Sequence, residues 1–432
     1  MMRVGFYTLG CKVSQYETEA IAESFEKRGY ALSDFTDVCD IYVINTCTVT
    51  AEADRKSRQM IRRAKRSNPN SIVLVCGCYS QRSADEVSSI DGVDAVIGSA
   101  GKMDLVDIAE KLLTEKRQIV SVTDIEKEPF EKMRITRGPR TRVYVKIEDG
   151  CECKCTYCAI PSARGSVRSK NIDDVIEEVE ALSESGVPEV VLTGIETGSY
   201  GQDFDNGFRL ADLLVLLDER KSAKQIRLGS LAPELVGKDF VDKVKGLGIL
   251  APHFHLSIQS GSDSVLRRMK RRYSRKMALE NIEHIRGNIK NAAFTTDIMV
   301  GFPGETEEDF LDTVSFVREA RFLDAHVFAY SKRKNTPAES FPDQVPEDIK
   351  RKRSEDLIRV VKEVRNDVLS DIVLSGKALA VIFEEKRDGR LWYGHASTFA
   401  EVVAESEDDL HGVEKSVIPL RLENGLIYGK IL

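Results

Sequence analysis

The sequence lacks the features of a membrane-bound or exported protein. No apolar run approaches the roughly 18 residues that a membrane-spanning helix requires, and the start, MMRVGFYTLG, shows no signal-peptide pattern. We therefore expect no membrane association and a cytoplasmic location, where thiols stay reduced. The chain has 432 residues, too many for one compact core, so we expect several domains.

An excess of positive charge is also absent. The chain carries 63 Lys and Arg against 70 Asp and Glu, a net charge of −7, which gives no global sign of nucleic-acid binding. Local basic segments at 51–66, 267–276 and 332–334 suit either phosphate contacts or solvated helix faces. Trp392 is the only tryptophan; with Tyr393 it is a candidate for base stacking or for core packing.

Cysteine, by contrast, is well represented. Nine cysteines, an odd number, in a chain expected to be cytoplasmic argue against a disulfide framework and favour metal binding or catalysis. Their positions depend on the fold, which the alternation of strand and helix signals predicts.

The first part of the chain, residues 1–128, predicts an open, doubly wound α/β domain. Short runs rich in Val and Ile are typical of buried parallel strands, and helical segments separate them. The expected strands are 4–9, 41–44, 72–75 and 95–97, and the expected helices are 17–28, 51–66, 83–88 and 105–113.

A charged linker at 129–141 precedes two further domains. Residues 142–370 contain six strand–helix units, which predict a partial (β/α)6 barrel, and end in a long helix around 346–371. Residues 371–432 contain five short strand-like runs without helices, which predict a small antiparallel β-barrel. The expected strands begin near 143, 189, 226, 254, 294 and 325 in the larger barrel and near 378, 391, 401, 417 and 426 in the smaller one.

Cys151, Cys155 and Cys158 form a C-x3-C-x2-C pattern directly after the first barrel strand. Three thiolates can hold three irons of a [4Fe–4S] cluster and leave the fourth open to a chelating ligand. Tyr157 is placed to pack against an adenine ring. The alternative is a zinc site that recruits Cys153 as a fourth ligand.

Cys11, Cys47 and Cys78 each follow a predicted parallel strand. The carboxyl ends of such strands share one edge of the sheet, so the three thiols can converge on a second [4Fe–4S] cluster. The alternative is that they are buried, inert cysteines, as Cys39 and Cys76 are expected to be.

The C-x3-C-x2-C loop after the first strand of a partial barrel resembles the radical S-adenosylmethionine superfamily. The resemblance implies that the open iron binds S-adenosylmethionine (SAM) and that one-electron reduction yields a 5′-deoxyadenosyl radical. Five residues after later strands are then expected to bind this cofactor: Thr193, Gly194, Ser230, Gln259 and Val300.

Seven motifs together resemble the methylthiotransferase family: LGCKVSQYETE, NTCTVT, CGCYSQ, CECKCTYCAIPSARG, TGIETGSYG, HLSIQSGSD and DIMVGFPGET. The match covers essentially the whole chain and implies a final β-barrel of the TRAM type. It also implies two SAM molecules, one as methyl donor and one as radical source for sulfur insertion at C2 of an adenine. The first and third motifs look most like the branch that acts on N6-threonylcarbamoyladenosine beside the tRNA anticodon, although Ser14 replaces a usual Asn and Cys153 is unusual there.

The resemblance implies partners as well. These are the tRNA anticodon stem-loop, an electron donor such as a flavodoxin or ferredoxin, and an unidentified sulfur source; we expect a monomer. Two alternative substrates are isopentenyladenosine in tRNA and a ribosomal-protein aspartate. An alternative of another class is a non-enzymatic RNA-binding protein with structural zinc. Residues 371–432 hold 11 acidic and 7 basic residues, a poor balance for gripping phosphates.

Overall fold

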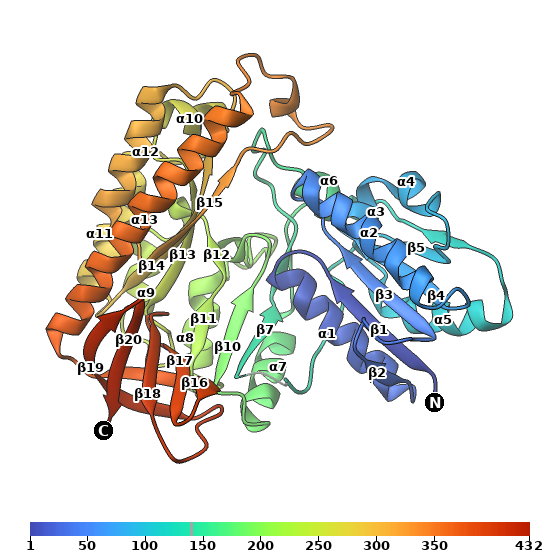
Figure 1. Cartoon of the computed structure of the whole chain (residues 1–432), viewed down its shortest axis with the longest axis horizontal. Coiled ribbons are helices and arrows are strands. Elements are labelled where there is room, and N and C mark those ends of the chain that lie inside the picture. Colours follow the sequence, from blue (N-terminus) through green and yellow to red (C-terminus); the bar gives the residue numbers. More distant parts are fainter. Residues whose placement is uncertain (139–140) are drawn as a thin grey trace.

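The computed structural model describes residues 1–138 and 141–432, and Figure 1 shows three sheet systems along the chain. A parallel sheet holds the N-terminus, a larger partial barrel follows, and a small closed barrel holds the C-terminus. Positions 139 and 140 of the predicted linker lie outside the described residues. Among the described residues, no helix is both long enough and apolar enough to cross a bilayer.

The N-terminal sheet has six parallel strands in the order β2-β1-β3-β4-β5-β6, which confirms the predicted open α/β architecture. Sequence patterns found four of them; β2 and β6 were missed because they are short edge strands that are only partly buried, whereas the equally short β5 is fully buried. The strands are β1 (Arg3–Thr8), β2 (Ala31–Ser33), β3 (Ile41–Thr46), β4 (Ile72–Gly77), β5 (Ala95–Ile97) and β6 (Ile119–Ser121).

Helices cover both faces of this sheet, as a doubly wound fold requires. One face packs on α1 (Lys12–Lys27) and α5 (Leu105–Thr114), and the other on α2 (Ala51–Ser67), α3 (Cys78–Arg82) and α4 (Ala84–Ser88). The chain leaves β1 towards β2 and then crosses to β3 on the opposite side, so the strand order reverses between β1 and β3.

Helix α1 is buried on two sides. Ile21 and Phe25 join the core of the N-terminal sheet, whereas Tyr16 and Ala20 join the core of the larger barrel. Because α1 lies between the two units, the residues at its start face both of them. The predicted helix began five residues too late, at Glu17.

The larger barrel confirms the predicted six-stranded, all-parallel arrangement. The third strand is interrupted at Gly229, between β11 and β12, and the sheet divides there into two parts, β11-β10-β7 and β12-β13-β14-β15. The strands are β7 (Arg142–Lys146), β10 (Glu189–Thr193), β11 (Ile226–Leu228), β12 (Ser230–Leu231), β13 (His253–Gln259), β14 (Ala293–Val300) and β15 (Asp324–Ala329).

Helices surround the outside of this barrel, and their apolar faces form one core with the outward-facing strand residues. They are α7 (Ile172–Glu184), α8 (Leu210–Arg220), α9 (Lys238–Val244), α10 (Asp263–Arg268), α11 (Arg275–Asn288), α12 (Glu307–Ala320) and α13 (Glu347–Ser375). The segment before β7 also contributes: Met133 and Ile135, within the predicted linker, are buried in this core.

The C-terminal barrel is closed and has five strands in the order β16-β17-β18-β20-β19. One detail of the prediction was wrong: β18 and β20 pair in parallel, so the barrel is mixed and not wholly antiparallel. A closed ring with an odd number of strands cannot alternate direction at every pair. The strands are β16 (Leu379–Asp388), β17 (Leu391–Ala396), β18 (Glu401–Glu405), β19 (Glu414–Glu423) and β20 (Leu426–Ile431).

Candidate cofactor site between the sheet and the barrel

The first thiol triplet lies along one edge of the N-terminal sheet. Cys11 separates β1 from α1, Cys47 follows β3, and Cys78 opens α3 directly after β4. β1, β3 and β4 are neighbours in the sheet, so the loops after their carboxyl ends lie side by side. The edge beside a reversal of strand order is where ligands usually bind in such sheets.

Two glycines allow these loops to approach each other. Gly10 and Gly77 each precede a cysteine of the triplet and have φ of 125° and 101°, a region that strains L side chains. A Cβ on Gly10 would lie 3.2 Å from Cβ of Cys47, and one on Gly77 would lie 2.5 Å from Oδ1 of Asn45. A side chain at either position would therefore push neighbouring loops apart.

The three thiols influence one another electrostatically. Cys47 and Cys78 are buried and Cys11 is exposed. Burial, together with the nearby thiols of Cys78 and Cys11, raises the pKa of Cys47 to about 12. Because metal ligands are thiolates, binding a metal cluster here would release protons.

The second triplet lies in the loop after β7. A short antiparallel ribbon, β8 (Glu148–Asp149) with β9 (Arg168–Ser169), closes the base of this loop, and α6 (Ile160–Arg164) follows its last cysteine. Three N–H groups donate to the sulfurs: Cys153 N to Cys151 Sγ, Ile160 N to Cys158 Sγ, and Arg271 Nη1 to Cys155 Sγ, each at 3.4 Å. Hydrogen bonds to cysteine sulfur are a usual feature of iron–sulfur sites.

Neighbouring elements fix the conformation of this loop. The backbone N–H of Thr156 donates to the carbonyl of Met269 at 3.1 Å, and its hydroxyl donates to the carbonyl of Arg268 at 2.9 Å. Tyr157 packs edge-on against Phe302, with ring centroids 6.3 Å apart, in an apolar cluster behind the loop. Contact of Tyr157 with an adenine ring stays a prediction.

The other predicted cofactor-binding residues lie at or next to the ends of later barrel strands, but the side chain of one of them, Val300 at the end of β14, points away from the barrel interior. Thr193 and Gln259 end β10 and β13, Ser230 begins β12, and Gly194 follows β10. The side chain of Val300 instead packs outward, in the core between β14 and the helices α12 and α13. Its carbonyl accepts from the N–H of Tyr330, so the side chain does not line the barrel interior.

Two buried carboxylates beside the loop escaped the sequence patterns. Oε2 of Glu148 accepts from the backbone N–H of Glu196 at 2.9 Å, and Oε1 has no hydrogen-bond partner among the described residues. Burial raises the pKa of Glu148 well above its usual value and that of Glu196 to about 8. Gly194 is required here, because a Cβ on it would lie 2.4 Å from Oε2 of Glu148.

This orphaned oxygen provides a test of whether SAM fits. SAM carries a methionyl ammonium group, which is a cationic hydrogen-bond donor. A buried carboxylate oxygen without a partner lacks such a donor. Glu148 lies three residues before Cys151, at the base of the loop. The donor set therefore fits an iron–sulfur cluster with SAM beside it.

A buried ionic network joins the two thiol triplets. Arg164, which is 0% exposed, donates from Nε to Cys78 Sγ at 3.1 Å and from both terminal nitrogens to Glu17, at 2.5 and 3.1 Å. It also pairs with Asp149 at 3.1 Å. Arg164 follows the second triplet and Glu17 follows Cys11 on α1, so one side chain ties both cysteine loops together.

The network has more positive than negative charge. Lys102 and Lys146 pair with Glu17 at 2.8 and 3.0 Å, and Lys146 also pairs with Asp149 at 2.8 Å. With Arg164, three buried cations face two carboxylates. The surplus cation adjoins Cys78, where a thiolate would balance it.

Neither triplet is arranged around a single ion. Within residues 1–138 and 141–432, no three His, Cys, Asp or Glu side chains form a group suited to one metal ion.

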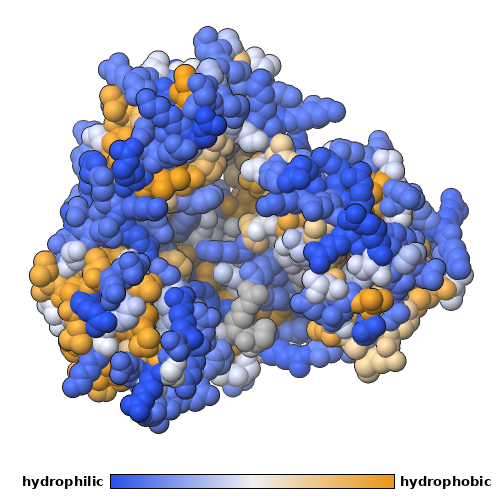
Figure 2. All heavy atoms as spheres, viewed as in Figure 1, coloured by the Kyte–Doolittle hydropathy of each residue, from blue (hydrophilic) through white to orange (hydrophobic). Residues whose placement is uncertain are grey.

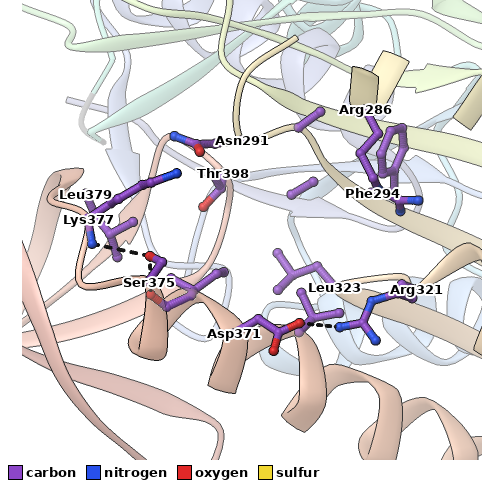
Figure 3. Close-up of a pocket in the computed structure, with 14 residues that line it drawn as sticks. Arg286, Asn291, Phe294, Arg321, Leu323, Asp371, Ser375, Lys377, Leu379 and Thr398 are labelled. Carbon is purple, nitrogen blue, oxygen red and sulfur yellow. Dashed lines mark hydrogen bonds and ion pairs between the residues drawn. The ribbon is translucent and has the colours of Figure 1, made fainter. Parts of the chain in front are cut away.

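A separate cavity of about 260 Å³ lies where the larger barrel meets α13 and the C-terminal barrel, shown in Figure 3. Arg286, Arg321, Asp371 and Lys377 surround it above a floor that includes Leu323. None of the predicted site residues lines it.

Two family models match separate parts of the chain. The model of the Radical SAM superfamily matches residues 145–317, and that of the Uncharacterized protein family UPF0004 matches residues 3–98. The fold resembles a radical S-adenosylmethionine methyltransferase, TsrM, from Kitasatospora setae, with a TM-score of 0.56 at 14% identity over 78% of this chain and 75% of that one.

Curated relatives are much more similar in sequence. Threonylcarbamoyladenosine tRNA methylthiotransferase MtaB of Bacillus subtilis is 38% identical over 95% of this chain and 92% of its own length. MtaB of Aquifex aeolicus is 38% identical over 89% and 94%. The tRNA-2-methylthio-N(6)-dimethylallyladenosine synthase of Clostridium tetani is 35% identical over 82% and 80%.

Proposed function

The chain belongs to the methylthiotransferase family of radical SAM enzymes, and from this premise we propose that it places a methylthio group on C2 of N6-threonylcarbamoyladenosine beside the tRNA anticodon. Membership of the superfamily implies a [4Fe–4S] cluster and SAM. The single observation that carries the proposal is the whole-length similarity to enzymes of this substrate, at 38% identity.

We propose that each thiol triplet holds one [4Fe–4S] cluster, Cys151, Cys155 and Cys158 the first and Cys11, Cys47 and Cys78 the second. When bound, the first supplies one-electron cleavage of SAM, and the second holds the sulfur that another SAM methylates. Radical chemistry suits C2 of adenine because this C–H is not acidic enough for general-base catalysis. The domain boundaries 1–128, 142–370 and 371–432 belong to the same proposal.

The protein's own residues orient these groups. Glu148 offers a buried carboxylate oxygen to the methionyl ammonium, and Arg271 and Arg164 donate to one cysteine sulfur of each triplet. The Arg164 network also removes water from the wall between the two loops, since its charged groups are 0–6% exposed. A dry site protects a carbon radical from side reactions.

The tRNA-binding surface of this proposal includes the outer face of α2. Arg55, Arg58 and Lys65 already pair with neighbouring carboxylates. The remaining basic side chains of α2 are exposed and available to phosphates: Lys56, Arg62, Arg63 and Arg66. Figure 2 shows predominantly hydrophilic residues over this part of the molecule and a hollow between it and the barrel.

The aromatic candidates of the C-terminal barrel do not form a free stacking platform. Trp392 is 5% exposed and belongs to the barrel core. The hydroxyl of Tyr393 bonds Glu401, and the guanidinium of Arg387 lies 3.7 Å above its ring. Opening this stack would be required before Tyr393 meets a base.

The remaining partners are proposals from the family alone: a flavodoxin or ferredoxin as electron donor, an unidentified sulfur source, a monomeric state and a cytoplasmic location. A second candidate substrate is isopentenyladenosine, which the similarity to dimethylallyladenosine synthases at 33–35% identity favours over a ribosomal-protein aspartate.

The substrate is tested on the tRNA of a deletion strain. We expect the 2-methylthio form of N6-threonylcarbamoyladenosine to disappear and the unmethylthiolated nucleoside to accumulate, measured by mass spectrometry of digested tRNA. An unchanged amount of the methylthio nucleoside would contradict the proposal, and loss of methylthio-isopentenyladenosine would favour the second candidate.

The division of labour between the triplets is tested on two variants. Cys11→Ala should retain cleavage of SAM to 5′-deoxyadenosine and lose sulfur insertion, whereas Cys155→Ala should lose both. Chromatography measures 5′-deoxyadenosine, and mass spectrometry measures the modified RNA. Cys39→Ala, which removes a buried thiol outside both triplets, is the control and should retain both activities; equal loss of cleavage in the first two variants would reject the scheme.

A further inference from the structure

The interior of the larger barrel is open and polar. Along β7 the outward-facing Val143 and Val145 are buried, while the inward-facing Arg142 and Tyr144 keep solvent access. The same alternation occurs on β13, where His255 is partly exposed between buried neighbours. Closed parallel barrels fill this space with branched apolar side chains; here it is lined by groups that form hydrogen bonds.

A carboxylate and two imidazoles form a polar layer across three neighbouring strands. Asp297 lies 3.2 Å from Nε2 of His255 and 3.5 Å from Nδ1 of His326. The other nitrogen of His255 is 2.9 Å from Oγ1 of Thr295. His326 is 75% exposed on its side-chain surface, so this layer borders accessible space.

Below this layer, charged side chains form ion pairs with one another. Glu189 pairs with both Arg142 and Arg227. The ring of Phe399 lies against the same two guanidinium groups, at 5.2 and 5.1 Å, and stacks on His253 at 4.7 Å. The lower end of the barrel is therefore closed and its charges are paired.

Lys12 reaches this interior from the N-terminal unit. It directly follows Cys11, at the start of the helix that lies between the two units, and its Nζ lies 6.0 Å from the centre of the Tyr144 ring. Its main electrostatic neighbours are the like charges of Arg142 and Arg227, ahead of Asp297 and Glu189. Among the described residues, Asp297 pairs with two histidines and Glu189 with two arginines, so neither carboxylate is paired with Lys12.

Lys12 is exposed, so its ammonium group is accessible to an anionic ligand, and a ligand that excluded water from it would have to supply the counter-charge. We infer that Lys12 binds the carboxylate of the N6-threonylcarbamoyl group and thereby sets the preference for this base over a base with a neutral N6 substituent. This inference rests on the proposed function and names a specificity-determining residue for it.

The covalent structure of the base agrees with this placement. In adenine, C2 and C6 flank the same ring nitrogen, so the substituent on N6 extends beside the carbon that receives sulfur. A base whose C2 faces the Cys11 triplet therefore carries its N6 substituent close to the next residue, Lys12. An isopentenyl group offers this ammonium no counter-charge, and its burial there would leave the cation desolvated and unpaired.

The test compares three synthetic anticodon stem-loops on the cluster-loaded protein. They carry N6-threonylcarbamoyladenosine, its carboxamide analogue without the negative charge, or plain adenosine, and fluorescence anisotropy measures each dissociation constant. We expect the wild-type protein to bind the carboxylate RNA about 10- to 100-fold more tightly than the carboxamide RNA, the range of a charged hydrogen bond. Lys12→Gln should abolish that ratio, and binding of the carboxamide RNA should stay within about twofold.

Two further variants keep the test decisive. Lys27→Gln changes an exposed lysine on the same helix and should retain the wild-type ratio. Lys12→Arg keeps the charge and should retain most of the ratio, even if the glutamine variant loads less iron. Equal weakening of all three RNAs by Lys12→Gln would identify a phosphate contact and overturn the inference, as would an unchanged ratio. If the wild-type protein does not distinguish the carboxylate RNA from plain adenosine, the proposed function fails first.

Discussion

Arg164 connects the two thiol triplets. Its side chain donates a hydrogen bond to a cysteine of one triplet, and its backbone follows the other triplet in the chain. Its donor Nε lies 3.1 Å from Cys78 Sγ. A cationic donor stabilises the more negative, reduced state of a cluster, and therefore raises its reduction potential. Its partner Glu17 stays ionised although burial opposes the charge, because Arg164, Lys102 and Lys146 lower the pKa of Glu17 well below its usual value.

We therefore predict that Arg164→Gln lowers the midpoint potential of the cluster on Cys11, Cys47 and Cys78. Redox titration followed by electron paramagnetic resonance measures it, in a background where the other triplet is replaced by alanine. Breaking a buried ion pair should also destabilise the protein by about 3 kcal/mol, seen as a lower Tm.

Two control variants separate charge from general damage. Arg164→Lys should give an intermediate potential, since the charge remains and the bidentate geometry is lost. Arg134→Gln removes an exposed arginine that pairs with Glu177 and should leave the potential unchanged. The same midpoint in Arg164→Gln and the wild-type background would contradict the assigned role.

At this scale the cysteines were predictable and their polar neighbours were not. Cys47 and Cys78 follow strands whose Val- and Ile-rich pattern is visible in the sequence, and Cys11 follows an apolar and aromatic strand. The order of the three strands places the loops after them side by side. Arg164 and Glu17 are 147 positions apart, and no local periodicity links them. The place of Val300 at a strand end was predicted, while the outward direction of its side chain was not; contact of Val300 with SAM stays a prediction.

Among the elements, the β8–β9 ribbon controls the loop of the second triplet. Gly150 leaves β8 with φ of 87°, and a Cβ there would lie 1.9 Å from the backbone carbonyl oxygen of Ser166. The atoms on both sides of this clash belong to the backbone, which cannot move aside as a flexible side chain could. Any side chain at this position must open the ribbon that closes the loop.

Gly150→Ala should therefore lose the cluster on Cys151, Cys155 and Cys158 and retain the other. We expect iron to fall from about eight to about four atoms per chain, the content of one [4Fe–4S] cluster, measured by a colorimetric iron assay on anaerobically prepared protein. Gly186→Ala is the matched control, because Gly186 has a similar φ of 92° with no atom near its added Cβ. Iron loss of the same size in both variants would show that backbone strain, and not the clash, is responsible.

The elements themselves followed from the sequence except where topology decides them. Strand and helix types were predicted for most elements of both α/β units, since Val- and Ile-rich runs and amphipathic segments carry the signal locally. The edge strands β2 and β6 and the break between β11 and β12 at Gly229 were not predicted. The parallel pair in the C-terminal barrel follows from closing five strands into a ring. The sequence pattern of a single strand does not show this closure.

For the whole molecule, one buried carboxylate contributes to the attachment of the C-terminal barrel, beside an apolar cluster that includes Leu323 and Leu369. Glu189 at the start of β10 orients Arg142 and Arg227. Arg227 donates to the carbonyl of Ser397 at 3.0 Å, and Arg142 pairs with Glu384 at 3.3 Å. Both contacts lie in the C-terminal barrel, so the charge on Glu189 helps to hold two units together.

This carboxylate makes the attachment sensitive to acid. Burial opposes ionisation of Glu189, but the two arginines outweigh it and lower its pKa from 4.5 to about 2. A carboxyl whose pKa is lowered by folding contributes its stability above the unfolded value and loses it as pH falls through the folded value. The contribution, about 3 kcal/mol from a shift of this size, is therefore present above pH 4.5 and lost between pH 4.5 and about 2.

Trp392 allows this loss to be measured, because the only tryptophan of the chain is buried in the C-terminal barrel. We expect its fluorescence to shift towards that of a solvated indole between pH 4.5 and 2. Glu189→Gln should be less stable at pH 7, since it removes the carboxylate that Arg142 and Arg227 share, and should show a smaller shift in that window. Glu405→Gln, an exposed change on β18, should behave as wild type. A transition of equal size and midpoint in Glu189→Gln would contradict the role of Glu189 in the attachment. It would assign the acid sensitivity to Glu384, which pairs with His395 at 2.7 Å.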